Sequence, residues 1–204
     1  MKHYPSIPRF SDCPQDYLGR PCIAFEKPDG SNIRAEWSKK QGWYKFGTRK
    51  TMIGGDSMFK QAADLVCATG DTIPTLLGHP KFPFVAFFEF LGDGSFAGFH
   101  VEDDKRIVLL DVSIYKKGMI TPDEFTSVFP NRMIAGNKPV FTTPKVVFKG
   151  VLTQEFVDDV RSGKIGSFEG AVIKGTDDKG RPWMAKVKSE AWLDMVRRKG
   201  LPED

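Results

Sequence analysis

Short runs of apolar residues, bounded by glycine, proline and acidic residues, recur along most of the chain. Runs of this length with turn residues between them are typical of β-strands. The pattern predicts strands over residues 22–27, 31–37, 42–47, 82–91, 106–114, 171–174 and 183–188. The fourth of these is the most apolar part of the chain, broken only by Pro83 and Glu89, and we expect it to be buried.

Apolar residues at helical spacing favour helices over residues 57–68, 72–78, 122–128, 154–161 and 190–198. Thr153 and Ser189 stand where N-caps are expected, and Gly163 and Gly200 stand where helices end. Residues 1–20 contain three prolines and are expected to form an extended arm. Hairpins mixed with helices, without a repeat or a clear linker, predict an α+β fold of antiparallel sheets flanked by helices.

Composition is ordinary for a soluble globular protein, with 40% hydrophobic and 27% charged residues. We expect residues 1–204 to form a single domain. The formal charge of +4 fits an anionic partner without requiring one. The three cysteines lack metal-ligand spacing, which indicates reduced thiols inside a cell. No apolar segment resembles a signal peptide or spans a membrane, so we expect a cytoplasmic protein with no membrane partner.

Lys27 directly follows a short apolar run and is followed by the tight turn Asp29-Gly30. This spacing places a lysine amine at the end of a strand, with a carboxylate two residues away. Such an amine becomes a nucleophile when burial or neighbouring cations favour its neutral form. Taken alone, Lys-x-Asp-Gly is more often a surface hairpin turn.

Further charged residues occur at strand ends or inside apolar strands. Glu89 lies within an aromatic strand, where an unpaired carboxylate would be costly. Lys186 and Lys188 alternate along one strand, so they point to the same face and repel each other unless an anion lies between them. The other positions of this kind are Arg49, Glu169 and Lys174. Each has a structural explanation as a turn, a solvated face or a salt bridge, but together they supply the charges that hold a triphosphate and a divalent metal.

The order of these segments resembles the covalent nucleotidyltransferase superfamily, which comprises DNA ligases, RNA ligases and mRNA capping enzymes. The resemblance runs from about residue 22 to residue 188 and implies an ATP-grasp-like nucleotidyltransferase domain. It implies that Lys27 attacks the α-phosphate of a nucleotide and forms a lysyl–nucleotide intermediate. It implies that Glu89 binds the ribose and that Lys186 and Lys188 contact the α-phosphate and the leaving group.

The same resemblance implies roles for the remaining candidates. Glu169 would help to place the metal, Asp29 would orient Lys27 or hold a metal-bound water, and Arg49 would bind a phosphate or the acceptor end. The nucleotide site would also include Glu26, Gly30, Asn32, Leu110 and Lys174.

Asn32 and the segment 169–174 are similar to the RNA ligase 2 group, because DNA ligases and capping enzymes usually carry arginine at the position of Asn32. This similarity implies ATP and Mg²⁺ (or Mn²⁺) as cofactors, and RNA ends with a 5′-phosphate and a 3′-OH as partners, possibly within a nicked duplex. Leu110 stands where an aromatic residue usually stacks on the adenine, which leaves the choice of base open. The sequence ends 16 residues after Lys188, so we expect a catalytic domain without an OB-fold or other C-terminal domain. A monomeric RNA-repair enzyme is expected, acting in the host cytoplasm if a phage encodes it.

Three alternatives remain: a small ATP-dependent DNA nick ligase, a capping-type guanylyltransferase, and a non-catalytic protein that binds RNA ends. RNA would bind through its phosphates to a basic surface. The candidate contacts are Arg34, Lys39, Lys40, Lys45 and Lys50. The basic residues 197–199 are better explained by the dipole of the last helix.

Overall fold

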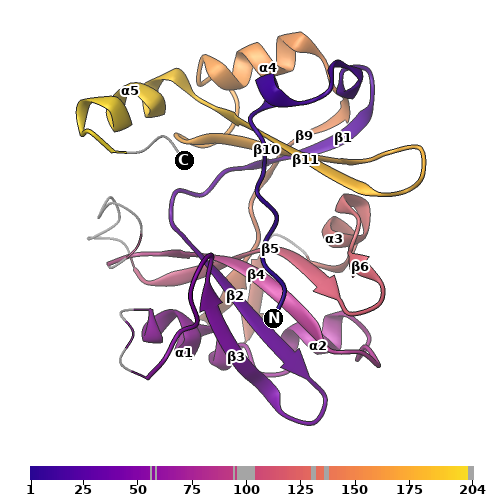
Figure 1. Cartoon of the computed structure of the whole chain (residues 1–204), viewed down its shortest axis with the longest axis vertical. Helices are drawn as coiled ribbons and strands as arrows, with labels where there is room; N and C mark the ends of the chain where they lie inside the picture. The colour runs from indigo at the N-terminus through magenta and orange to yellow at the C-terminus, as the bar shows by residue number, and fades with distance from the viewer. Residues whose placement is uncertain are drawn as a thin grey trace. The chain divides into compact units, whose positions relative to one another are not determined.

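The computed structural model describes residues 1–55, 57, 59–93, 95, 104–129, 132–135 and 138–201. It divides into two compact units (Figure 1). The first unit comprises Met1–Pro5, Asp29–Ile120 and Glu124–Thr143, and the second comprises Ser6–Pro28, Thr121–Asp123 and Pro144–Asp204. Each unit is organised around its own β-sheet.

The second unit contains a four-stranded antiparallel sheet in the order β11-β10-β1-β9. Its strands are β1 (Pro21–Glu26), β9 (Val146–Val151), β10 (Gly170–Thr176) and β11 (Pro182–Lys188). Helix α4 (Gln154–Arg161) packs against β10 and β11, and α5 (Glu190–Arg198) follows β11. Both helices begin at the predicted caps, since the hydroxyls of Thr153 and Ser189 accept backbone N–H bonds from the first turn.

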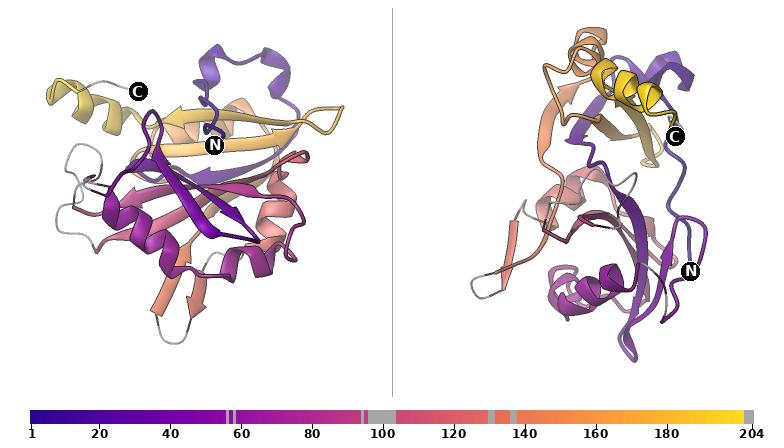
Figure 2. Two further views of the ribbon diagram at one scale, coloured as in Figure 1. Left: turned by 60° about the horizontal axis from the view of Figure 1, so that its bottom comes forward. Right: turned by 90° about the vertical axis from the view of Figure 1, so that its left-hand side faces the viewer.

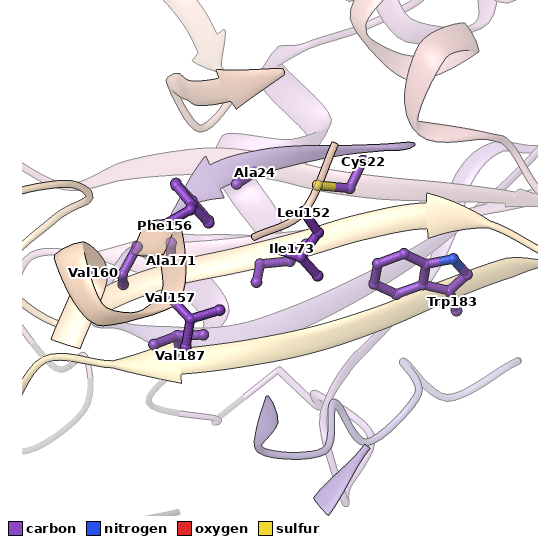
Figure 3. Close-up of a cluster of buried hydrophobic side chains, with 10 residues drawn as sticks. All are labelled: Cys22, Ala24, Leu152, Phe156, Val157, Val160, Ala171, Ile173, Trp183 and Val187. Atoms are coloured by element: carbon purple, nitrogen blue, oxygen red, sulfur yellow. The ribbon is translucent and has the colours of Figure 1, made fainter. Parts of the chain in front are cut away.

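The core of this unit lies between α4 and one face of the sheet (Figure 3). It consists of Cys22, Ala24, Leu152, Phe156, Val157, Val160, Ala171, Ile173, Trp183 and Val187. Because side chains alternate along a strand, the residues between these positions face the other way. Lys186 and Lys188 are such residues, so they share a face as predicted.

The first unit contains a mainly antiparallel sheet in the order β3-β2-β4-β5-β8-β7, with β6 beside β5. Its strands are β2 (Ser31–Ser38), β3 (Gly42–Thr48), β4 (Phe84–Leu91), β5 (Arg106–Ile114), β6 (Gly118–Met119), β7 (Arg132–Ala135) and β8 (Lys138–Thr142). The helices α1 (Lys60–Ala68) and α2 (Thr72–Leu76) cover one face of this sheet (Figure 2). Every residue of β4 is buried, as its apolar sequence predicts.

The predicted α+β class is confirmed, and each predicted strand and helix has a counterpart, including α3 (Pro122–Val128). Helix α1 was expected from residue 57 but begins at Lys60, and Met58 lies outside the described residues. The extended arm was wrong in part, because residues 10–12 and 15–17 form turns of 3-10 helix. Strands β6 to β9 were not predicted. None of the described helices is long and apolar enough to span a membrane.

Candidate active site

Lys27 is held where β1 ends. Its backbone N–H donates to the carbonyl of Gly170 at 3.0 Å, and its own carbonyl accepts from Ser167 Oγ at 2.5 Å. Its ammonium group lies 2.7 Å from Oε1 of Glu169. Lys27 is therefore held both by its backbone and by its ammonium group, while 21% of its side chain stays accessible to solvent.

Glu169 belongs to a tight turn, residues 167–170, in which Ser167 and Gly170 exchange two backbone hydrogen bonds of 3.0 Å. Gly170 has a φ of +130°, and a Cβ at this position would collide with the carbonyl oxygen of Val187. Only glycine suits that conformation and that contact. The glycine therefore lets the turn place the Glu169 carboxylate, whose side chain is 5% exposed, against Lys27.

Lys188 approaches the same carboxylate oxygen, with its Nζ 3.8 Å from Glu169 Oε1. Its ammonium group also lies over the ring of Trp192, 3.9 Å from the centroid, in cation–π geometry. The Lys188 side chain is 7% exposed. Two ammonium groups thus lie against the same carboxylate oxygen, and cations grouped in this way suit the phosphates of an anionic ligand.

The other candidates of the second unit lie on the same sheet. Lys174 is buried, with its Nζ 5.0 Å from the Phe25 ring centroid. Lys186 is half-buried, and its backbone N–H donates to Pro8 of the N-terminal arm at 2.9 Å. The strand register places Glu26 opposite Ala171, on the face that carries the core rather than the face that carries the lysines.

In the first unit, the Glu89 carboxylate accepts a hydrogen bond from a backbone group. Its Oε1 accepts from the N–H of Gly30 at 3.2 Å, and Asn32 lies directly opposite it on β2. A Cβ at Gly30 would collide with the carbonyl oxygen of Phe90, so this close approach needs glycine. Asn32 donates from Nδ2 to the carbonyl of Phe88 at 3.3 Å. Glu89 and Gly30 are therefore hydrogen-bonded to each other, and Asn32 is the cross-strand neighbour of Glu89.

Leu110 occupies an irregular position in β5. Phe87 pairs with Asp111 and Phe88 pairs with Leu109, so the register shifts at Leu110 and forms a bulge. Bulges of this kind re-aim side chains beside functional sites. The next residue, Asp111, is buried and accepts a short hydrogen bond from the hydroxyl of Tyr4.

Tyr4 was not predicted as a site residue, because nothing in the local sequence indicates a partner more than a hundred residues away. Burial, followed by the charge and hydrogen bond of Asp111, raises the pKa of the Tyr4 phenol well above its usual value. The phenol therefore stays protonated and donates its hydrogen bond to Asp111.

Two predicted arginines differ in their surroundings. Arg49 is exposed in the loop after β3, and His3 Nδ1 donates to its carbonyl at 3.0 Å. Arg34 is 3% exposed and donates to the carbonyls of Thr48 and Lys2, so its assignment to the RNA-binding surface was wrong. Burial lowers the pKa of its guanidinium, and its hydrogen bonds to the carbonyls of Met1 and Lys2 anchor the N-terminal residues. Asp29 is half-buried in the turn before β2.

Within the described ranges, no group of three or more histidine, cysteine or acidic side chains forms a metal site. Magnesium in nucleotide sites is usually bound by one or two carboxylates together with substrate phosphates and waters. The buried carboxylate of Glu169 beside two lysines fits that mode of binding better than it fits a closed protein cage.

No protein-family model matches the chain, and no curated protein matches it. Solved structures of the RNA ligase of Naegleria gruberi do match. One variant with ATP and Mn has a TM-score of 0.70 at 14% sequence identity and covers 95% of this chain and 58% of that chain. Another, with AMP and Mn, has a TM-score of 0.70 at 14% identity and covers 97% and 58%. The ligase with pyrophosphate has a TM-score of 0.68 at 14% identity and covers 97% and 58%.

These matches define the class of fold. The chain has the fold of the RNA ligase nucleotidyltransferase domain, which confirms the expectation from the order of the motifs. It spans 58% of the length of the solved ligase chains that it matches. At 14% identity the likeness concerns the fold.

Proposed function

We propose that this chain is the nucleotidyltransferase part of an ATP-dependent RNA ligase, with Lys27 as the nucleophile. The observation that carries this proposal is the group formed by Lys27, Glu169 and Lys188, in which a fixed amine and a second cation share one buried carboxylate. The fold supports it, since the matched RNA ligase structures were determined with ATP and Mn, AMP and Mn, and pyrophosphate.

In the first step, the nitrogen of Lys27 loses a proton and attacks the α-phosphorus of ATP. A phosphorus–nitrogen bond forms, the bond to the β-phosphate oxygen breaks, and pyrophosphate leaves. Glu169 holds the amine in place until the nucleotide arrives, and Lys188 offers positive charge to the transferring phosphoryl group. Lys186, on the same face of β11 as Lys188, is assigned to the departing pyrophosphate.

A divalent ion, Mg²⁺ or Mn²⁺, bound with ATP would neutralise charge on the phosphates. Glu169 is the carboxylate that we assign to it, and Asp29 is a second candidate on the sequence pattern alone. For the nucleoside, we assign the ribose to Glu89 and the base to Leu110, which lies at the bulge in β5. Arg49, Lys174, Gly30 and Asn32 complete the proposed nucleotide site, whereas Glu26 lies on the core face of its sheet and is not assigned to that site.

In the second step, an oxygen of an RNA 5′-phosphate attacks the phosphorus of the lysyl-AMP. The phosphorus–nitrogen bond breaks, Lys27 regains its proton, and AMP is joined to the RNA end. In the third step, a 3′-OH attacks the 5′-phosphorus, AMP leaves and the ends are sealed. We further propose that the protein acts as a cytoplasmic monomer on broken RNA, either free or within a nicked duplex.

Incubation with Mg²⁺ and ATP radiolabelled in its α-phosphate, followed by denaturing electrophoresis, tests this proposal. The expected result is label on the wild type and none on Lys27→Ala. Lys149→Ala is a matched control, because Lys149 is an exposed lysine on the same sheet. Absence of label on the wild type, after bound AMP has been removed with pyrophosphate, would overturn the proposal and favour a non-catalytic RNA-end-binding protein.

Two related outcomes identify the alternatives. Label from GTP but not from ATP would indicate capping chemistry, which Leu110 leaves open. Label from ATP, with nicked DNA sealed faster than RNA ends, would indicate a small DNA ligase. Asn32 favours the RNA ligase, because DNA ligases and capping enzymes usually carry arginine at this position. Its side chain donates a hydrogen bond to β4.

A further inference from the structure

An exposed phenylalanine lies on the turn that carries Glu169. Phe168 is 59% exposed, whereas the other phenylalanines among the described residues are buried or half-buried. A single exposed apolar residue needs no functional explanation by itself. Phe168 differs because the residue that follows it is the buried carboxylate that contacts Lys27 at 2.7 Å.

The backbone that presents this ring is fixed from several sides. Ser189 Oγ donates to the carbonyl of Phe168 at 2.6 Å, and the N–H of Ser189 donates to the carbonyl of Glu169 at 3.0 Å. Ser167 and Gly170 close the turn with the two backbone hydrogen bonds between them. An aromatic ring on a backbone already ordered loses little conformational entropy when it binds a partner.

We propose that the Phe168 ring is a stacking platform for the nucleobase at the 5′-phosphate end of the polynucleotide substrate. This inference rests on the proposed function, in which the 5′-phosphate must reach the AMP carried by Lys27. The nucleoside attached to that phosphate is then the part of the substrate nearest to Lys27 and Glu169. Consecutive Cα atoms lie about 3.8 Å apart, so the backbone of Phe168 lies directly beside the residue that contacts Lys27.

The chemistry of the ring determines what it recognises. Every nucleobase has an aromatic face, so stacking on phenylalanine accepts any terminal base. The ring has no hydrogen-bonding group with which to read the base edge or the 2′-OH. Phe168 therefore supports affinity for a terminal base without sequence selection.

Separate measurement of the reaction steps tests this inference. Phe168→Ala should form lysyl-AMP from ATP at the wild-type rate, because the ring is assigned to the polynucleotide and not to the nucleotide donor. Transfer of AMP from the isolated lysyl-AMP protein to 5′-phosphorylated RNA should slow by about tenfold, which is the size of one lost base–aromatic stack. Phe168→Tyr should restore transfer, and Phe168→Leu, which keeps apolar bulk without a ring, should not.

A fluorescence measurement reports on stacking directly and needs no catalysis. RNA with 2-aminopurine as its 5′-terminal base should be quenched by the wild type and by Phe168→Tyr, but not by Phe168→Ala or Phe168→Leu. Val151→Ala is the matched control, because Val151 is 53% exposed and lies opposite Pro21, at the end of β1 remote from Lys27.

The outcomes separate this inference from the proposed function. If the wild type forms no lysyl-AMP, the proposed function fails, while the quenching series still reports whether Phe168 stacks on a base. If lysyl-AMP forms but Phe168→Ala transfers AMP and quenches like the wild type, the stacking platform is refuted and the ligase stands. Equal activity of Phe168→Leu and Phe168→Tyr, or a loss of lysyl-AMP formation in Phe168→Ala, would also refute it.

Discussion

One carboxylate shared by two ammonium groups is the central feature at the scale of single residues. Glu169 contacts Lys27 at 2.7 Å and Lys188 at 3.8 Å through the same oxygen. The order of the motifs in the sequence is enough to select these three residues. Their shared contact could not be predicted, because it depends on the turn at Ser167 and on the positive φ of Gly170.

Tyr4 is a residue whose contact the sequence could not indicate. Its hydroxyl donates to Asp111, the neighbour of Leu110, across most of the length of the first unit's sequence. A contact between such distant positions leaves no local pattern in the chain. Proline-rich residues at the start predicted an extended arm, but not that one of its side chains would be buried.

The ring of Trp192 is expected to position Lys188 for phosphate contact. Trp192→Leu removes the cation–π contact, whereas Trp192→Phe keeps an aromatic face at the same place. We predict that lysyl-AMP formation slows by about tenfold in Trp192→Leu and by much less in Trp192→Phe, since a buried cation–π pair is worth up to about 2 kcal/mol. Single-turnover labelling with ATP measures both. Equal rates in the two variants would show that the ring only fills the core.

At the scale of elements, alternation along the strands explains most of what the sequence predicts. One face of β11 carries Trp183 and Val187 and the other carries Lys186 and Lys188, as a period of two requires. Strands β8 and β9 pair with the distant strands β5 and β1, and among the described strands β7 pairs only with its neighbour β8, so none of the three has a strong pattern of its own from which it could be predicted. The bulge at Leu110 likewise depends on pairing with β4.

A substitution at Gly170 tests how much the stability of the protein depends on the close approach of β10 and β11. Gly170→Ala places a methyl group against the carbonyl of Val187 at a positive φ, and should lower the free energy of unfolding by about 3 kcal/mol. Gly180→Ala is the matched variant, because Gly180 also has a positive φ but has no atom within 4 Å of the added Cβ. Strain alone should cost it about 1 kcal/mol. Urea titrations compare the two, and equal losses would contradict the collision.

The buried thiol of Cys22 gives the second unit a dependence on alkaline pH. Burial raises the pKa of this thiol from its usual 9.0 to about 11. The unfolded chain therefore loses the proton at lower pH than the folded protein does, so stability that is present below pH 9 falls as the pH rises towards 11.

Cys22→Ala should remove that part of the pH dependence. Urea unfolding at several pH values between 9 and 11 compares the slope of stability with that of the wild type. The variant is expected to show the shallower decline, although its stability at neutral pH is lower because a buried side chain has been shortened. Parallel declines in the two proteins would exclude Cys22 as the cause.

At the scale of the whole molecule, the candidate residues fall in both compact units. The second unit contains Glu169 and the lysines Lys27, Lys174, Lys186 and Lys188, and the first contains Asn32 and the hydrogen-bonded pair of Gly30 and Glu89. The fold class follows from hydrophobic patterning and from the order of motifs, and the solved RNA ligase structures confirm it. The division into two compact units has no signal in the sequence, because no linker rich in glycine, proline or charge separates them.

The proposed binding of RNA through its phosphates, which the net charge of +4 fits, predicts an affinity that falls with salt. Lys39 and Lys40 are exposed at the turn between β2 and β3, and we expect them to contact phosphates. Their joint change to glutamine should weaken RNA binding and reduce the slope of log affinity against log salt by about 1.4, or about 0.7 per lost contact with a single strand. The control is the exposed pair Lys116 and Lys117, changed in the same way. An equal effect of both pairs would show that RNA affinity follows the net charge and not contacts made by Lys39 and Lys40.

The most direct test of the account is mass spectrometry of the intact protein after incubation with ATP and Mg²⁺, followed by mapping of the modified peptide. The account predicts one added AMP per chain, joined to the side-chain nitrogen of Lys27 and released by pyrophosphate. An unmodified protein, or AMP on another lysine such as Lys174 or Lys188, would contradict it.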